Sequence, residues 1–195
     1  MEDRRFLGPE DPLPSSPRRV LVTGASGSGK STVARAVAAR LGLPYTEIDS
    51  LYHGPDWVPR PAFVADVTTL VAQPAWATEW QYSTVRGLLA DRADLLIWLD
   101  LPRWLILIQV TIRTLRRRFR REPLWNGNLE PPLWTILRNA DHIIRWSWRS
   151  HARVQPRVVT LSHSHPQLPV VRLRTRRDIS RWLNALPWST NNLGR

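Results

Sequence analysis

The sequence predicts an α/β fold of three layers, in which a five-stranded parallel sheet lies between two layers of helices. Two observations support this class. Short apolar or β-branched runs alternate with longer segments of helical periodicity along the 195 residues, and a glycine-rich segment separates the first run from the first helical pattern. We expect one domain over residues 18–186 with right-handed crossovers, a disordered arm over 1–17, and a polar tail over 187–195.

The first predicted strand, residues 18–23, leads into the segment GASGSGKST at 24–32, and a helical pattern follows over 33–41. The segment matches the G-x-x-x-x-G-K-[ST] pattern of a P-loop in the strand-loop-helix context that this motif requires. Its glycines let backbone N–H groups point into one concavity, to which the helix adds the positive end of its dipole. The predicted fold is therefore a three-layer P-loop NTPase. The residues expected to bind the nucleotide are Gly24, Ala25, Ser26, Gly27, Ser28, Gly29, Lys30, Ser31 and Thr32.

Lysine usage supports this interpretation. Of the 28 basic side chains, 27 are arginine, and the single lysine is Lys30. A planar guanidinium cannot replace a compact ammonium at every site, so a lysine retained inside this motif indicates a contact with the β- and γ-phosphates of ATP. The adjacent Ser31 is the predicted ligand of Mg²⁺.

The second predicted strand, residues 44–49, ends with two acidic side chains on one side, Glu47 and Asp49. Ligands of an open parallel sheet bind beyond the carboxyl ends of its strands, so both side chains should face the same crevice as the P-loop. Asp49 could hold Mg²⁺-bound water or a substrate hydroxyl. A solvated strand end is the alternative interpretation.

Three further strands complete the predicted sheet. The third, residues 76–78, is followed by Glu79, and the fourth, residues 93–100, is a nearly continuous apolar run that ends in Asp100. Such a run is typical of a parallel strand buried on both faces. The fifth strand and the last helix are expected over residues 170–173 and 178–185.

From residue 102 onward the pattern is helical, with one apolar stripe and one face of arginines. The stripe comprises Ile108, Ile112, Leu115 and Phe119, and the arginine face comprises Arg113, Arg116, Arg117 and Arg120. Guanidinium groups packed so densely repel one another and need anions nearby. The loop over 123–132 is predicted to separate this helix from a second one over about 133–153, which gives an arginine-rich lid at about residues 113–135.

Charge is distributed unevenly along the chain. Residues 1–102 carry ten basic and twelve acidic side chains, whereas residues 103–181 carry seventeen arginines and four acids, a net charge of +13. Such a field could serve nucleic acid, an acidic membrane surface or a polyphosphate ligand. The longest apolar stretch, residues 104–112, is too short to span a bilayer, and the absence of cysteine excludes disulfides and thiolate metal sites. We therefore expect a cytoplasmic protein without a membrane partner.

Three segments carry a resemblance to a known family: residues 45–59, residues 78–83, and the stretch Leu-Trp-Asn-Gly-Asn at 124–128. Together with the P-loop, they resemble the adenylate-kinase-related proteins called DNA topology modulation proteins. These belong to the wider group of nucleoside monophosphate and shikimate kinase-like P-loop kinases. The likeness covers about residues 18–185. It implies a kinase that uses ATP and Mg²⁺.

The resemblance also implies roles for single residues. Relatives usually carry Asp-Gly-Asn-Tyr where this chain has Glu79-Trp80-Gln81-Tyr82, and the Asp helps to order Mg²⁺, so Glu79 ranks above Asp100 as the metal-ordering acid. Trp80 fills the glycine position, where it either stacks on a planar substrate or belongs to the core. Arg86 is either a ligand of an acceptor phosphate or a solvated side chain.

The lid of such kinases closes over ATP and brings arginines to the transferring phosphoryl group. Within the arginine cluster, Arg117, Arg121 and Arg149 are the residues expected to make these contacts.

Two functional hypotheses follow. The first is phosphoryl transfer from ATP·Mg²⁺ to a small acceptor, a nucleoside, a nucleotide or another hydroxyl compound, with Asp49 or Glu79 as base. The second is a nucleic-acid-associated ATPase or topology-modulating protein, which the basic half and the aromatic residues Trp125, Trp134, Trp146 and Trp148 suggest. Chain length favours the first, because no separate binding module fits between residues 18 and 185. The sequence leaves the acceptor and the oligomeric state open.

Overall fold

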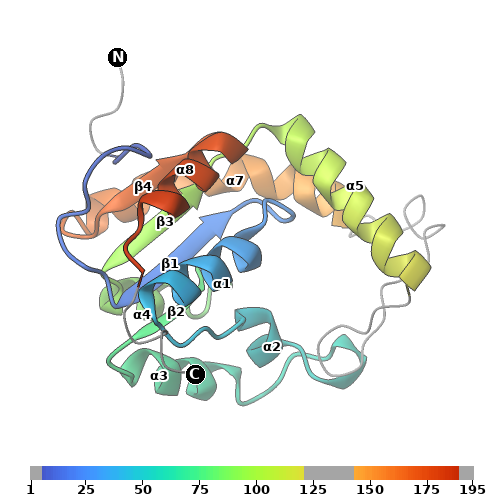
Figure 1. Cartoon of the computed structure of the whole chain (residues 1–195). Coiled ribbons are helices and arrows are strands. Elements are labelled where there is room, and N and C mark those ends of the chain that lie inside the picture. The colour runs from blue at the N-terminus through green and yellow to red at the C-terminus, as the bar shows by residue number, and fades with distance from the viewer. Residues whose placement is uncertain (1–5, 121–142, 189–195) are drawn as a thin grey trace.

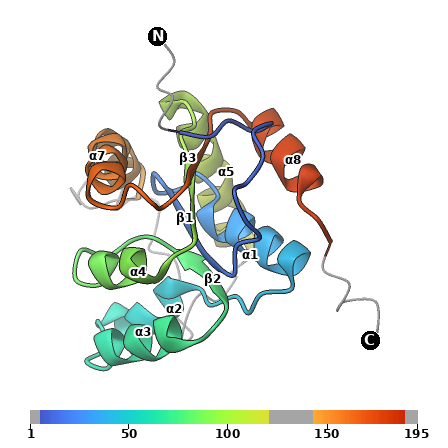
Figure 2. The same ribbon diagram turned by 90° about the vertical axis from the view of Figure 1, so that its left-hand side faces the viewer.

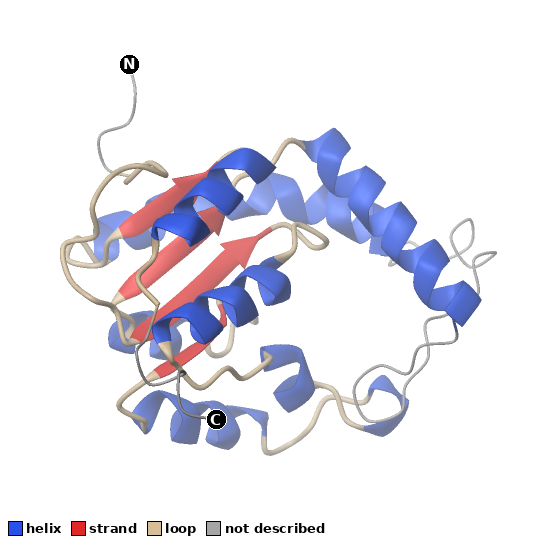
Figure 3. Cartoon of the chain, viewed as in Figure 1, coloured by secondary structure: helices blue, strands red, loops and turns tan. Residues whose placement is uncertain are grey.

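A computed structural model describes residues 6–120 and 143–188 of the chain, with side chains described over 6–112 and 151–188 (Figure 1). Its sheet has four parallel strands in the order β2-β1-β3-β4. The strands are β1 (Arg19–Gly24), β2 (Trp76–Glu79), β3 (Leu95–Leu99) and β4 (Val170–Leu173). All four arrows point the same way (Figure 3), so their carboxyl ends meet at one edge, where ligands of such sheets bind.

Helices cover both faces of the sheet (Figure 2). On one face lie α1 (Lys30–Leu41) and α8 (Arg176–Ala185); on the other lie α4 (Arg86–Arg92) and α7 (Ile143–Ser164), with α3 (Phe63–Ala72) beside α4. The remaining helices are α2 (Ile48–Tyr52), the short 3-10 helix η1 (Pro55–Trp57) and α5 (Arg103–Arg120). The three-layer α/β architecture that the sequence predicts is confirmed.

The core consists of two large hydrophobic clusters, one on each face of the sheet. Along β3, Leu96 and Trp98 pack into the cluster under α4 and α7, while Ile97 packs into the cluster under α1 and α8. This alternation follows the two-residue period of a strand. Every residue of β3 is buried, because helices cover both sides of a parallel sheet.

The prediction of a strand over residues 44–49 is wrong. Only Tyr45 pairs with β2, through the bonds Ala77 N–H to Pro44 O (2.8 Å) and Thr46 N–H to Ala77 O (3.1 Å). The chain then turns into α2 at Ile48, whose N–H donates to the buried Glu79 carboxylate (3.0 Å). This bond holds the backbone in a helical turn and ends the pairing, so the sheet has four strands and not five.

The N-terminal arm was expected to be disordered, and over residues 6–11 it is docked instead. Leu7 pairs with β4, since its N–H donates to Val170 O and its carbonyl accepts from Arg172 N–H, both at 2.8 Å. The Phe6 ring lies edge-on to Trp98, with centroids 5.5 Å apart. Phe6 and Leu7 are apolar side chains inside a proline-rich segment, and their contacts anchor it. The prediction of disorder relied on the average composition of residues 1–17 and did not consider these two side chains.

The predicted lid lies mostly outside the described residues. Of residues 113–135, the structure gives the backbone up to Arg120, the end of α5. The second arginine-bearing helix is described from Ile143, as α7. Among the described helices, none combines the length and the apolar character that crossing a membrane would demand.

Candidate active site

The P-loop connects β1 to α1, at the carboxyl edge of the sheet. Gly27 and Gly29 both adopt left-handed backbone conformations, with φ of 86° and 92°. A Cβ atom on Gly27 would lie 2.0 Å from Val110 Cγ2 of α5, so the loop also packs too closely for a side chain there. Gly29 caps α1, and its conformation turns the chain into that helix. The glycines of the motif are thus required by backbone geometry and by close packing.

Two polar groups of the loop have different surroundings. The Lys30 ammonium bends back over the loop, with Nζ 3.3 Å from Ala25 O. The Ser28 hydroxyl is buried, and within the described parts of the chain it has no hydrogen-bond partner. A buried hydroxyl without a partner is costly and uncommon. The Lys30 ammonium therefore lies at the N-terminus of α1, where an anion would bind, whereas the Ser28 hydroxyl is enclosed by the protein.

Beside the P-loop, Glu79 is a buried carboxylate at the end of β2, with 1% of its surface exposed. Its Oε1 accepts from the Tyr45 hydroxyl (2.8 Å) and its Oε2 from Ile48 N–H. Burial raises the pKa of Tyr45 far above its usual value, the charges of Glu79 and Glu47 act in the same direction, and the Ser31 hydroxyl opposes them. These groups, two of them predicted Mg²⁺ ligands, are therefore neighbours.

Asp49 lies in the first turn of α2, where it faces a second group of polar side chains. Its Oδ1 accepts hydrogen bonds from the Gln81 side-chain amide and from the Tyr82 hydroxyl (2.6 Å). The Tyr82 hydroxyl also lies 3.2 Å from His53 Nε2. Burial, and then the charge of Asp49, raise the pKa of Tyr82 well above its usual range, so this hydroxyl stays protonated. The network orients the Asp49 carboxylate from two sides.

Trp80 belongs to the core. Its side chain is 7% exposed, its indole N–H donates to Arg86 O (2.9 Å), and it packs in the cluster under α4 and α7. Of the two interpretations that the sequence leaves open, the structure supports packing. The large Trp80 side chain, at the position where relatives usually carry glycine, is therefore accommodated in the hydrophobic core.

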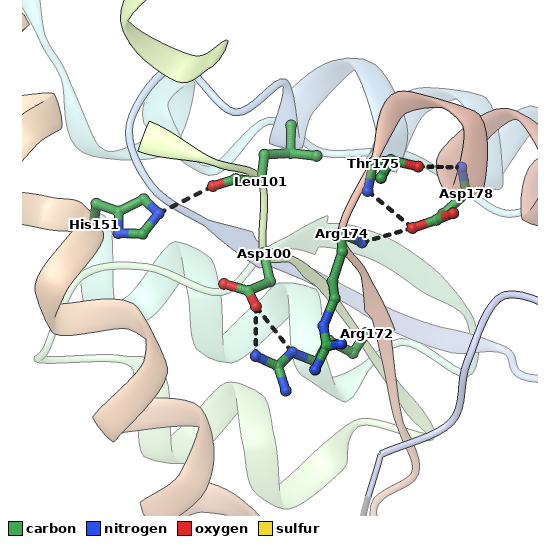
Figure 4. Close-up of polar contacts among 7 residues, drawn as sticks. All are labelled: Asp100, Leu101, His151, Arg172, Arg174, Thr175 and Asp178. Atoms are coloured by element: carbon green, nitrogen blue, oxygen red, sulfur yellow. Dashed lines mark hydrogen bonds and ion pairs between the residues drawn. The ribbon is translucent and has the colours of Figure 1, made fainter. Parts of the chain in front are cut away.

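Asp100 is engaged elsewhere. It accepts from Arg172 Nε (2.9 Å) and Nη2 (2.6 Å), and the two side chains meet at the end of β4 (Figure 4). In the same view, His151 of α7 lies 3.0 Å from Leu101 O, between α7 and the start of α5. The ion pair fixes the ends of β3 and β4, and the ranking of Glu79 above Asp100 stays a prediction.

The three arginines expected at the phosphoryl group stay predictions. Arg117 in α5 and Arg149 in α7 lie where only the backbone is described, and Arg121 lies outside the described residues. Arg86 opens α4, with its guanidinium carbon 5.8 Å from the centre of the Trp80 ring. Burial, and then the charges of Arg86 and Arg153, lower the pKa of Arg157. These three cations therefore lie near one another, where α4 and α7 face the same side of the sheet.

Several residues of the site are invisible to motif reasoning. Tyr45 and Tyr82 hold the two carboxylates, and Gln109 of α5 connects the P-loop to α8. With its amide oriented to satisfy both neighbours, Gln109 donates to Gly27 O (3.0 Å) and accepts from Arg176 Nη2 (3.0 Å). The sequence signal for Gln109 is that it is a polar amide inside the otherwise apolar helical stretch of residues 104–112. Residues 44 to 53 and 79 to 82 are held together by the pairing of Tyr45 with β2 and by the hydrogen bonds of Glu79 and Asp49.

No protein-family profile matches the chain. Part of the chain is similar to kinases. It is 42% identical over 74 aligned positions to a bifunctional pantoate ligase/cytidylate kinase of Synechococcus sp. (strain JA-2-3B'a(2-13)), which covers 29% of this chain and 14% of the relative. It is 45% identical over 58 residues to a shikimate kinase of Nitratidesulfovibrio vulgaris, covering 30% of this chain and 29% of the relative. The chain thus spans less than a third of the length of these curated relatives.

Solved structures resemble the chain over a larger share of its length. A gluconokinase from Sinorhizobium meliloti 1021 is 19% identical, with a TM-score of 0.48 and coverage of 87% of this chain and 91% of the other. A shikimate kinase from Bacteroides thetaiotaomicron is 11% identical, with a TM-score of 0.46 and coverage of 87% and 96%. None of these four proteins is a DNA topology modulation protein, so that narrower resemblance stays a prediction.

Proposed function

We propose that this protein is an ATP- and Mg²⁺-dependent kinase that transfers the γ-phosphoryl group of ATP to a hydroxyl of a small molecule. The observation that supports this most strongly is the P-loop, in which left-handed glycines lead into the N-terminus of α1 and Lys30 bends back over the loop, with Nζ 3.3 Å from Ala25 O. Two carboxylates with separate surroundings, Glu79 and Asp49, lie beside it. The sequence similarity to kinases points to the same chemistry.

The nucleotide would lie on residues 24–32. Lys30 would move from Ala25 O onto the β- and γ-phosphates. Ser31 and Glu79 would hold Mg²⁺, Ser31 directly and Glu79 through its remaining lone pairs, since each carboxylate oxygen can accept more than one hydrogen bond. Bound Mg²⁺ would neutralise charge on the phosphates.

Asp49 would act as the base. The acceptor hydroxyl would attack the γ-phosphorus, its proton would pass to the Asp49 carboxylate, and the bond from the γ-phosphorus to the bridging oxygen would break to release ADP. The bonds from Gln81 and Tyr82 would hold Asp49 in place. Arg117, Arg121 and Arg149 would reach the transferring group from α5, the lid and α7.

The acceptor would bind on the side of α2 and α4, and we propose a nucleoside, a nucleotide or a compound of similar size. Arg86, with Arg153 and Arg157 nearby, could bind an anionic group of the acceptor. The reaction would take place in the cytoplasm. A DNA-associated ATPase is the second candidate, motivated by the net charge of +13 over residues 103–181.

Release of ADP with Mg²⁺ and a panel of hydroxyl acceptors tests the proposal. Lys30→Met should reduce turnover by at least about a hundred-fold, because it removes the cation that would stabilise the negative charge of the γ-phosphoryl group in the transition state. Arg92→Met is the matched control, because it also replaces a cation by methionine. Arg92 lies at the end of α4 opposite to Arg86, and this variant should keep wild-type rates. ADP release that needs DNA and not a small acceptor would favour the second candidate.

A further inference from the structure

The turn after α2 holds an unusual backbone. Asp56 and Trp57, two consecutive residues with side chains, adopt left-handed conformations with φ of 53° and 62°. Left-handed backbone is disfavoured for residues other than glycine, and for a residue as bulky as tryptophan it is a true outlier. Such outliers persist where the surroundings enforce them, and they gather at sites of ligand binding.

Burial of the indole does not account for this conformation. Trp57 is 36% exposed, and it is absent from the buried clusters that contain its neighbours Tyr52, Phe63 and Tyr82. A tryptophan held for packing alone would be largely removed from water, as Trp76 and Trp98 are, with exposures of 0% and 1%. The turn instead keeps a large aromatic surface partly in solvent.

Ring contacts connect this indole to the proposed base. Trp57 lies edge-on to His53, with centroids 5.1 Å apart at 79°. His53 Nε2 is 3.2 Å from the Tyr82 hydroxyl, which is 2.6 Å from Asp49. The Tyr52 ring stacks on the Tyr82 ring, with centroids 4.0 Å apart, and this contact restrains the Tyr82 side chain. The rings of Trp57, His53 and Tyr82 thus form a chain of contacts that ends at the Asp49 carboxylate, the proposed base.

We propose that Trp57 is the acceptor-binding platform of this enzyme, and that the acceptor contains a ring that lies flat on the indole. The inference rests on the proposed kinase function and narrows its substrate class. An indole face stacks on a heteroaromatic base, and it also packs on the apolar face of a saturated ring, so nucleosides and cyclic hydroxyl compounds share the required chemistry. An open-chain polyol presents no such face.

The test compares acceptors and variants by ADP release. The acceptors are cytidine and adenosine, glucose and shikimate as non-aromatic rings, and gluconate as an open chain. The variants are Trp57→Ala, Trp57→Phe and Trp57→Gly, with Trp104→Ala on α5, 64% exposed, and Asp56→Gly as matched controls. Asp56→Gly relieves the neighbouring left-handed residue but keeps the indole.

We expect a ring compound to be the best acceptor. Trp57→Ala should raise its KM about ten-fold or more, Trp57→Phe should restore part of this, and the KM for ATP should stay unchanged. Preference for nucleosides over the non-aromatic rings identifies a base as the stacking group, and the reverse identifies a non-aromatic ring. Trp57→Gly should raise the same KM yet keep the melting temperature within about 2 °C of wild type, because relief of strain offsets the lost packing. Both controls should leave KM unchanged.

Several results would overturn the inference: gluconate as the best acceptor, turnover of no ring compound by a protein that binds ATP, or an unchanged acceptor KM in Trp57→Ala. Loss of self-association in Trp57→Ala at unchanged KM would also overturn it, and would assign the indole, with Val58 and Val64, to an interface. If ATP does not bind or Lys30→Met has no effect, the kinase proposal itself fails, which is a separate result.

Discussion

The two halves of the candidate active site are built in different ways. The nucleotide half consists of backbone: a loop of left-handed glycines, a helix N-terminus and close packing against α5. The acceptor half consists of side chains from α2, η1 and the residues after β2, joined by ring contacts and by bonds to Asp49. Backbone recognition demands a fixed motif, whereas side-chain recognition can change with the ligand. We therefore propose that the first half has a general chemistry and that the second half decides the substrate.

The largest effect should come from the acceptor half. Asp49→Asn keeps the size of the side chain but removes the proposed base, so kcat should fall by about 10²- to 10⁴-fold while the KM for ATP changes little. The measurement is steady-state kinetics with the best acceptor. Asp100→Asn is the matched control, because Asp100 pairs with Arg172; it should lower stability but keep kcat. Equal losses of kcat in both variants would contradict the assignment of Asp49.

In the nucleotide half, Gly27→Ala should act on structure first. The new methyl group would meet Val110 and the backbone would be strained, so we expect a loss of about 3 kcal/mol in the free energy of unfolding and weaker ATP binding. Denaturant unfolding and ATP titration measure the two effects. Adding Val110→Ala should relieve the clash but not the backbone strain. Wild-type stability in Gly27→Ala would refute the close packing of the loop on α5.

A smaller effect is expected far from both halves, where Asp94 ties β3 to β1. Asp94 accepts from Arg19 Nη2 (2.6 Å) and from the N–H groups of Arg18 and Arg19. Burial raises the pKa of Asp94, but these donors outweigh it, so the folded pKa is lowered. Its stabilisation is fully present above the unfolded pKa of about 3.9 and is lost as pH falls through the folded value.

Asp94→Ala should therefore cost about 2 kcal/mol at neutral pH. The difference from wild type should shrink only below about pH 4, in urea unfolding followed across pH. ATP and acceptor KM values should stay unchanged, which separates a loss of stability from a loss of function. A difference that grows on acidification would have the wrong sign.

The sequence predicts the nucleotide half well and the acceptor half poorly, for a physical reason. Glycine spacing and a single lysine report backbone geometry directly, so β1, the P-loop and α1 follow from local pattern. The end of the pairing at Tyr45 depends on a bond from Ile48 N–H to Glu79, thirty-one positions away. Likewise, the left-handed conformation of Trp57 has no counterpart in the local sequence pattern, which has no glycine at that position.

The pairing of Leu7 with β4 has a practical consequence for anyone who prepares this protein. An uncovered edge strand has unpaired N–H and C=O groups, which can form hydrogen bonds with any extended chain, including another copy of the same protein. Here Leu7 pairs with part of that edge, and Glu10, bound to Arg181, holds the same segment against α8. Removing residues 6–11 would expose this edge of β4, and we expect the shortened protein to aggregate more readily.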